Sequence, residues 1–180
     1  LYAFSAAKEI GDKVVGVVNV AGGVPIIEAK QCAKQSMRQK AFFFTARYAP
    51  AVLPALMRAA MSQIDNNGPE KVMHDMYAKN TIDRIAVSDA EIANVVTDGY
   101  RFTIAQGYKG FEGDAYQVVR NWTEIVEDLE QPVLLIHGAH DPVVLVDTVE
   151  AFAKRQNFQL EVLVNDGQLI FYSKPDEVLA

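Results

Sequence analysis

Two short stretches hold most of the side chains whose types and spacing suggest chemistry. The first is PVLLIHGAHDPVV (residues 132–144), in which an apolar run ends at His137 and Asp141 follows, directly before a proline. In an open α/β sheet, binding and catalytic residues gather at the carboxyl ends of the strands. A carboxylate there can orient a catalytic base, but Asp before Pro is also a common turn starter and helix cap. Both roles stay open for Asp141 at this point.

The second stretch closes the sequence and places an amide where a base is often presented. It is VNDGQLIFYSKPDEVLA (residues 164–180): a glycine turn, then Gln168, an apolar pair and a helix that begins at Pro175. An amide has no usable pKa, so Gln168 can orient a water or hold a hydrogen bond but cannot accept a proton. A turn-bonded or solvated amide is therefore the simpler interpretation of this residue.

The three histidines offer little replacement for a base at position 168. His137 ends an apolar run, which favours a hydrogen bond within the core. His140 is adjacent to Asp141, and neighbouring loop residues usually point apart. His74 lies in a polar helical stretch and is expected in solvent. No two histidines have the i, i+4 spacing of a metal-binding helix, so we expect neither a metal nor another cofactor.

Three apolar runs predict the strands that would position these residues. They lie at 13–20, 132–138 and 160–165, and they resemble strands of a parallel sheet that is covered on both faces. Helical patterns at 2–10 and 146–157 flank them. Alternation of helix and strand is typical of the α/β class, so we expect three parallel neighbouring strands with helices on both faces.

The long middle of the chain predicts helices and no strand. We expect helices at residues 28–49, 51–64, 66–79 and 88–106. The last of these opens with Ser88 and Glu91 at the spacing of a capping box. We interpret residues 23–125 as a helical cap inserted into a core formed by residues 1–22 and 126–180.

Taken in order, these motifs resemble the C-terminal portion of the α/β-hydrolase superfamily. The matching order is a strand, H-G-x-x-D-P-V-V, a helix, a strand, G-Q-L-I and P-D-E-V, and residues 1–25 and 108–180 carry the likeness. The resemblance implies that Asp141 is the acid of a Ser-His-Asp triad. It also implies that Gln168 stands at the position where the family has its histidine.

The resemblance further implies what lies outside the sequence. The nucleophilic serine of a G-x-S-x-G turn is expected before Leu1, together with the N-terminal half of the same fold. Ser5 cannot replace that serine, because it sits about one turn into a helix and lacks the flanking glycines. At most one triad member, Asp141, is therefore intact, and the chain as given is predicted to be inactive.

The helical middle carries a cluster of aromatic residues in AFFFTARYAP (residues 41–50). At helical spacing, most of these rings should pack against neighbouring helices. The resemblance adds that lids of this kind often present a few rings to an apolar substrate. Phe43, Phe44 and Tyr48 are the candidates for such a substrate pocket.

Bulk properties narrow the possible partners and surroundings. The net charge of the 180 residues is −6, so the chain as a whole has no electrostatic attraction for nucleic acid or anionic membranes. Cys32 is the only cysteine, which rules out an internal disulfide and suits a cytoplasmic location. No apolar run approaches the ~18–20 residues that a membrane span needs.

Two functions from different classes follow. The first is a hydrolase, esterase-like, that acts on a small, fairly apolar ester or related substrate through a serine upstream of Leu1. The second is a non-catalytic ligand-binding or interaction protein on a hydrolase scaffold, which has lost its base at position 168. A G-x-S-x-G turn just before Leu1 would favour the enzyme.

Overall fold

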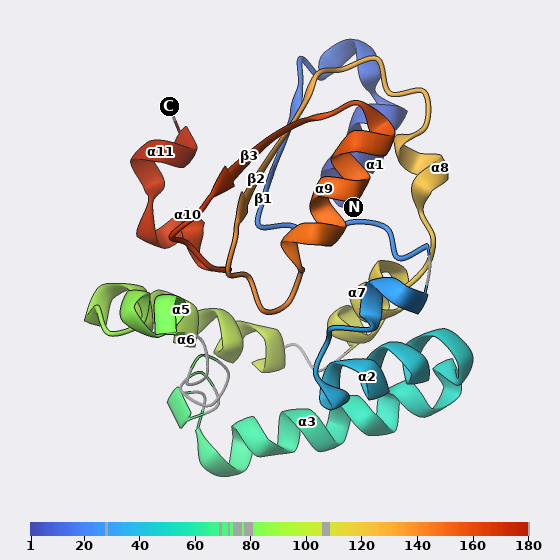
Figure 1. The fold of residues 1–180 in the computed structure, drawn as a ribbon. Coiled ribbons are helices and arrows are strands. Elements are labelled where there is room, and N and C mark those ends of the chain that lie inside the picture. Colours follow the sequence, from blue (N-terminus) through green and yellow to red (C-terminus); the bar gives the residue numbers. More distant parts are fainter. Residues whose placement is uncertain are drawn as a thin grey trace. The chain divides into compact units, whose positions relative to one another are not determined.

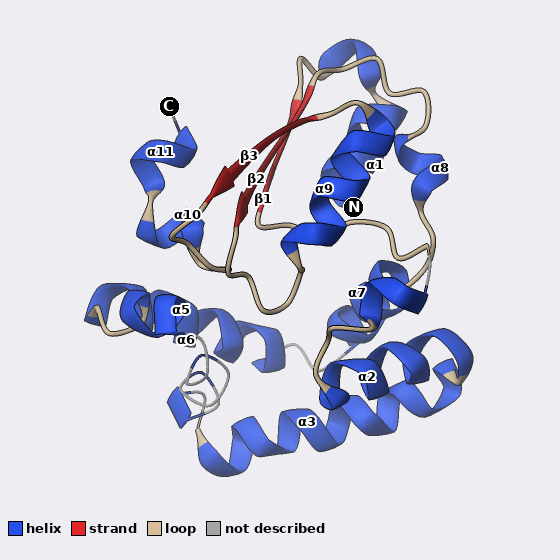
Figure 2. Ribbon diagram, in the orientation of Figure 1, coloured by secondary structure: helices blue, strands red, loops and turns tan. Residues whose placement is uncertain are grey.

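The computed structural model describes residues 1–27, 29–68, 70–71, 73, 77, 81–105 and 109–179. The chain divides into two compact units. The first joins Leu1–Cys32 with Arg120–Ala180, and the second is the intervening segment Ala33–Val119. All three described strands belong to the first unit (Figure 1, Figure 2).

A sheet of three parallel strands forms the centre of the first unit. In sheet order, the strands are β1 (Val17–Val20), β2 (Val133–Gly138) and β3 (Gln159–Leu163). Val17 of β1 pairs with Val133 of β2, and Leu135 of β2 pairs with Leu160 of β3. The expectation of three parallel neighbouring strands is confirmed.

The first strand is shorter than the apolar run that predicted it. The strand expected at 13–20 begins only at Val17, because Gly11–Lys13 form a 3-10 helix and residues 14–16 connect that helix to the strand. Val15, in this connection, is 95% exposed. The valines before Val17 therefore do not mark a strand that is buried on both faces.

Helices lie on both sides of the sheet (Figure 1), but one face is only partly covered: Val18 of β1 is 56% exposed, and Gln159 and Glu161 of β3 are exposed. The helices on one face are α1 (Tyr2–Glu9) and α9 (Val146–Gln156), with α8 (Thr123–Val126) packed against α1. On the other face lie α10 (Ile170–Ser173) and α11 (Pro175–Leu179). The helix α9 ends at Asn157, whose φ of 57° is the left-handed conformation that commonly terminates helices, and the helix expected at 146–157 is confirmed.

A group of aromatic rings fixes α1 and α9 against the same face of the sheet. The ring centroid of Phe4 in α1 lies 5.8 Å from that of Trp122 and 6.4 Å from that of Phe152 in α9. Phe158, directly before β3, stacks on Phe4 with 6.2 Å between centroids. Burial of each large ring contributes roughly 2–3 kcal/mol, so this cluster is a main source of stability in the first unit.

The described residues of the second unit form helices and no strand. They are α2 (Met37–Tyr48), α3 (Leu53–Asn67), α5 (Thr81–Ala86), α6 (Ala90–Ala105) and α7 (Lys109–Val118), with a 3-10 helix at Pro50–Val52. The helices α2, α3 and α7 share a small core of Ala46, Leu53, Met57, Ala115 and Val119. Most of the helix expected at 66–79 lies outside the described residues. Of the helices that the structure describes, none combines the length and apolar composition that a bilayer span requires.

The helix expected to begin at residue 28 begins instead at Met37. Ser36 and Gln39 cap α2 reciprocally: the Gln39 N–H donates to Ser36 Oγ at 3.2 Å, and the Ser36 N–H donates to Gln39 Oε1 at 3.0 Å. This capping box satisfies two backbone donors at the helix start. The prediction missed it because the residues before Ser36 also have helical composition.

The helix α6 is capped by Asp89 and not by the expected pair of Ser88 and Glu91. Asp89 Oδ1 accepts the backbone N–H groups of Glu91 at 2.8 Å and Ile92 at 3.2 Å. Ser88 Oγ instead donates to Ile85 O, at 2.6 Å. A carboxylate accepts more strongly than a hydroxyl at the positive end of a helix, which explains why Asp89 takes this position.

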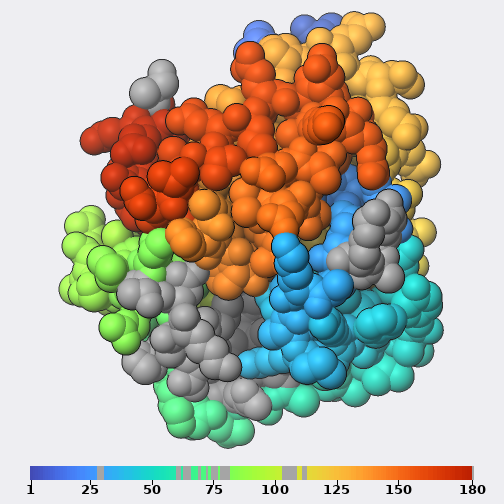
Figure 3. Space-filling view, in the orientation of Figure 1, coloured from blue at the N-terminus to red at the C-terminus, as the bar shows by residue number. Residues whose placement is uncertain are grey.

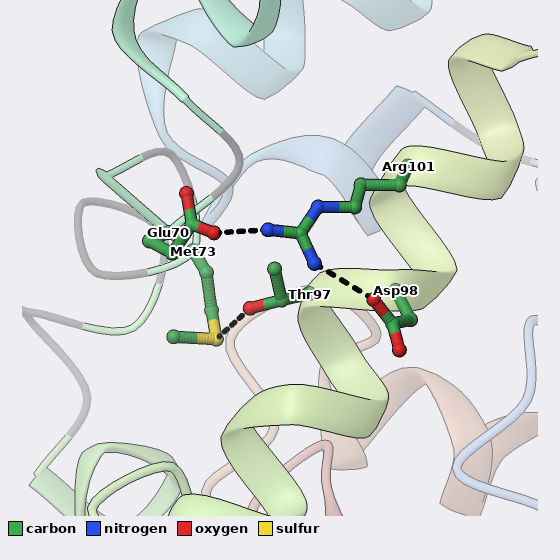
Figure 4. Close-up of polar contacts among 5 residues, drawn as sticks. All are labelled: Glu70, Met73, Thr97, Asp98 and Arg101. Carbon is green, nitrogen blue, oxygen red and sulfur yellow. Dashed lines mark hydrogen bonds and ion pairs between the residues drawn. The ribbon is translucent and has the colours of Figure 1, made fainter.

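Polar contacts tie α6 to the segment that precedes α5 (Figure 4). Arg101 donates to Glu70 Oε1 at 2.5 Å and to Asp98 Oδ1 at 2.8 Å. Thr97 Oγ1 donates to Met73 Sδ at 3.6 Å, and both of these residues are buried. The exposed ion pairs contribute little to stability, so the buried contact and its apolar surroundings carry more of the packing here.

Candidate active site

Asp141 lies in the loop that follows β2, at the carboxyl end of the sheet. Its backbone N–H donates to Gly138 O at 3.2 Å, which turns the chain sharply after the strand. Asp141 is 3% exposed, and its Oδ1 accepts the backbone N–H groups of Val143 at 2.7 Å and Val144 at 2.9 Å. The turn-capping role that the sequence left open for Asp141 is therefore present.

His137 holds the same loop from the end of β2. Its Nε2 lies 2.7 Å from Val144 O, and because a carbonyl oxygen can only accept, the imidazole carries a proton on Nε2. The same nitrogen lies 3.6 Å from Asp141 Oδ2. The hydrogen bond within the core that was predicted for His137 is confirmed. With Nε2 as a donor to the loop, this nitrogen is not a proton acceptor.

Gln168 lies in the loop that follows β3, beside the loop of Asp141. The backbone N–H of His140 donates to Asp166 O at 3.0 Å, so the two loops are joined by a hydrogen bond between their backbones. Gln168 itself is partly buried. The fold therefore brings together the two loops that carry the residues singled out in the sequence.

Gly138 allows the two loops to come this close. A Cβ atom at this position would lie 2.2 Å from Gly167 O and 2.6 Å from Asp166 O. Both of these atoms belong to the backbone, which cannot rotate away as the end of a flexible side chain can. Only glycine therefore fits at the end of β2 while the second loop stays in place.

A second buried carboxylate, which the sequence did not indicate, lies at the carboxyl end of the sheet. Asp166 is 7% exposed, and its Oδ1 accepts a long hydrogen bond from Ser173 Oγ, at 3.4 Å. The pKa of the exposed Lys174 is raised, chiefly by its hydrogen bond to Glu177 and the charge of Glu177, and further by the charge of Asp166. In the sequence, the Asp-Gly pair at 166–167 indicates a turn. Residues in turns are usually exposed, so the pair gives no sign that Asp166 is buried.

The remaining polar candidates of the sequence are His140, His74 and Ser5. His140 is exposed, and its backbone N–H makes the contact with Asp166. His74 lies outside the described residues. Ser5 lies inside α1, where its N–H donates to Leu1 O at 3.0 Å, as expected for a helical residue. Within the described part of the chain, no group of three or more His, Cys, Asp or Glu side chains could hold a metal ion.

The three aromatic pocket candidates lie on α2, but they lie on different sides of the helix. Phe43 is partly buried and borders the small core of the second unit, with 6.1 Å between its ring centroid and that of Phe42. Phe44 and Tyr48 are 55% and 68% exposed, and their rings stack with 5.7 Å between centroids. A role for these residues in a substrate pocket stays a prediction.

Several solved enzyme structures resemble this chain. E-2-(acetamidomethylene)succinate hydrolase matches with a TM-score of 0.57 at 13% identity, over 98% of this chain and 59% of that chain. An epoxide hydrolase from Bacillus megaterium matches with a TM-score of 0.57 at 15% identity, over 98% and 62%. An esterase from Thermogutta terrifontis matches with a TM-score of 0.52 at 16% identity, over 98% and 57%. No protein-family model and no curated protein matches the sequence.

These matches establish the fold. At identities of 13–16%, the likeness concerns the arrangement of the backbone and not the chemistry. The chain spans 57–62% of the length of the three structures, or about three fifths. Together with the three parallel strands, the matches confirm the fold that the sequence led us to expect.

Proposed function

We propose that this chain, which has the α/β-hydrolase fold, is part of a hydrolase that cleaves a small, fairly apolar ester or related substrate. The observation that supports the proposal best is the joining of the Asp141 and Gln168 loops at the carboxyl ends of adjacent parallel strands. In a Ser-His-Asp enzyme, the acid and the base must meet in this way.

Each residue of the pair has a distinct proposed role. Asp141 would hold a histidine at position 168 in the tautomer that accepts the serine proton. Its burial and its two backbone donors favour a single orientation of the carboxylate, which an orienting acid needs. Gln168 occupies the base position but has no group that can take up the proton. The serine and the oxyanion donors would come from the N-terminal half of the same fold, outside residues 1–180.

The proposal extends to the rest of the chain. Within the segment expected to form the cap, residues 23–125, the second unit Ala33–Val119 would be the cap, and Phe43, Phe44 and Tyr48 would offer apolar surface to the substrate. The chemistry of a Ser-His-Asp site uses protein groups alone, so the proposed mechanism involves no metal or other cofactor. A cytoplasmic location, suggested by the single Cys32, is part of the same proposal.

A histidine at position 168 tests the proposed mechanism. In the full-length protein, Gln168→His should raise the rate of p-nitrophenyl ester hydrolysis by roughly 10²–10⁴-fold, which is the usual contribution of a general base. The gain should be lost in Gln168→His/Asp141→Asn, because the asparagine cannot stabilise the imidazolium. Gln168→Asn is the matched control and should leave the rate unchanged. A correctly folded Gln168→His protein without any gain would contradict the proposed mechanism.

The amide at position 168 also favours a second candidate, a non-catalytic ligand-binding or interaction protein on the same scaffold. This candidate predicts that an apolar ester binds without turnover, whether glutamine or histidine occupies position 168. The residues directly before Leu1 distinguish the two candidates. A G-x-S-x-G turn there supports the hydrolase, and the same turn with its serine replaced supports the binding protein.

A further inference from the structure

The chain has a negative net charge but contains one segment that is basic. Residues 29–64 contain six basic residues and no acidic one, whereas the rest of the chain contains 11 basic and 23 acidic residues. The six are Lys30, Lys34, Arg38, Lys40, Arg47 and Arg58. The charge of this segment is opposite in sign to that of the remainder. An attraction to anionic surfaces, which the chain as a whole lacks, can therefore exist locally.

The helix α2, within this segment, has an apolar stripe on its exposed side. Met37, Phe44 and Tyr48 are 79%, 55% and 68% exposed. At 3.6 residues per turn, these three positions fall within about 40° of one another around the helix axis. The opposite side of α2 carries Ala46, which is fully buried in the core of the second unit. A helix that is apolar on both sides is usually covered on both sides, so the stripe suits a further apolar partner.

Basic side chains border the apolar stripe on both sides. By the same helical geometry, Arg38 lies on one side of the stripe, and Lys40 and Arg47 lie on the other. The guanidinium carbon of Arg47 lies 5.8 Å from the ring centroid of Tyr48, which keeps a cation beside the stripe. An apolar centre with lysine and arginine at its borders offers the two contributions to membrane binding, which are burial of apolar area and attraction to anionic lipids.

We infer that the exposed side of α2 binds the surface of a bilayer that contains anionic lipids. The residues of this α2 surface are Met37, Arg38, Lys40, Phe44, Arg47 and Tyr48. The apolar side chains would enter the boundary between headgroups and acyl chains, and the basic side chains would contact lipid phosphates. A soluble polyanion fits the basic borders but not the exposed apolar side chains of Met37, Phe44 and Tyr48 between them, which favours the lipid surface.

The inference does not involve Asp141 or residue 168, but it assigns lipid contacts to two of the proposed pocket residues. It needs only that α2 is at the surface, and Figure 3 shows residues of the segment around α2, in light blue, on the visible face. It does change the prediction for the substrate pocket. If Phe44 and Tyr48 contact lipid, Phe43 is the pocket candidate that remains on α2.

Binding of the full protein to vesicles tests the α2 surface. We expect binding to vesicles of phosphatidylcholine and phosphatidylglycerol, little binding to phosphatidylcholine alone, and weakening as salt is added. Phe44→Ser/Tyr48→Ser should lower the partition coefficient by roughly tenfold or more. Arg38→Gln/Arg47→Gln should lower it by roughly thirtyfold. Flotation of vesicles measures each of these values.

Two matched controls separate the α2 surface from general effects of charge and exposed rings. Phe102→Ser removes a ring of α6 that is 74% exposed, and Lys154→Gln/Arg155→Gln removes two exposed cations of α9. Neither change should alter vesicle binding by more than about twofold, because exposed single rings and scattered cations are ordinary surface features.

Several results would overturn the inference. One is no binding to the anionic vesicles, and another is undiminished binding by Phe44→Ser/Tyr48→Ser. Salt-dependent binding to heparin with the same affinity before and after that double change would assign the basic residues to a soluble polyanion. A dimer in sedimentation velocity that the double change abolishes, without vesicle binding, would assign the stripe to a second copy of the chain.

Discussion

The loops after β2 and β3 are neighbours, but different kinds of contact hold them. In the first loop, side chains set the course of the backbone: Asp141 accepts two backbone N–H groups, and His137 donates to a loop carbonyl. In the second loop the backbone takes part: Asp166 O accepts the backbone N–H of His140 at 3.0 Å, and Gly167 O lies close to Gly138.

In the proposed catalytic pair, this difference would allow residue 168 to change while the fold persists. The first loop needs Asp141 whether or not the protein is an enzyme, so a binding protein on this scaffold would keep it too. A substitution at position 168 leaves the backbone contacts of Asp166 and Gly167 in place. The residue at position 168 therefore says more about activity than Asp141 does.

The largest expected effect on stability lies at Gly138, the last residue of β2, against which the second loop packs. Gly138→Ala would place a methyl group 2.2 Å from Gly167 O, so either β2 or the second loop must move. We expect the free energy of unfolding, measured by urea denaturation, to fall by about 3 kcal/mol. In the matched control, Gly113→Ala in α7, nothing lies within 4 Å of the new Cβ. Alanine should raise stability there by up to about 1 kcal/mol. Equal stability of Gly138→Ala and the unchanged protein would show that the loops do not pack in this way.

A smaller effect should distinguish the side chains of the two loops. Asp141→Ala leaves two backbone donors without their acceptor in a partly buried loop, and we expect it to lower the free energy of unfolding by about 2 kcal/mol. Asp141→Asn keeps an acceptor oxygen and should cost less. Gln168→Ala leaves the backbone contacts of Asp166 and Gly167 intact, so we expect it to cost less than Asp141→Ala. The contrast fails if Gln168→Ala is as damaging as Asp141→Ala in thermal or urea unfolding.

The elements that were predicted best are those in which the apolar residues of the sequence are also the buried residues of the structure. The strand β2 and the helix α9 agree with their predicted bounds to within one residue, because the apolar run of β2 is buried and the left-handed Asn157 ends α9. In β1 the same reasoning failed, because Val15 is apolar but exposed. A run of valines does not reveal which of them pair with a neighbouring strand.

The candidate site was predictable in its loops but not in its contacts. The order of H-G-x-x-D and the later glycine turn pointed to Asp141 and Gln168, since both motifs are local in sequence. The approach of Gly138 to Gly167 and the burial of Asp166 depend on segments that are distant in the sequence. No local pattern carries that information, and the likeness to other enzymes at 13–16% identity gives the backbone arrangement alone.

The smallest expected effect concerns the charge around the second loop. The Lys174 ammonium donates to Glu177 Oε1 at 3.1 Å, and Glu177 contributes more than Asp166 to raising the pKa of Lys174. In an NMR titration, Glu177→Gln should therefore lower the Lys174 pKa more than Asp166→Asn does. Because folding raises this pKa, its stabilisation is complete below the ordinary lysine pKa and is lost as pH rises through the raised value. A larger decrease with Asp166→Asn would show that the buried carboxylate, and not the neighbouring helix, governs the charge of the second loop.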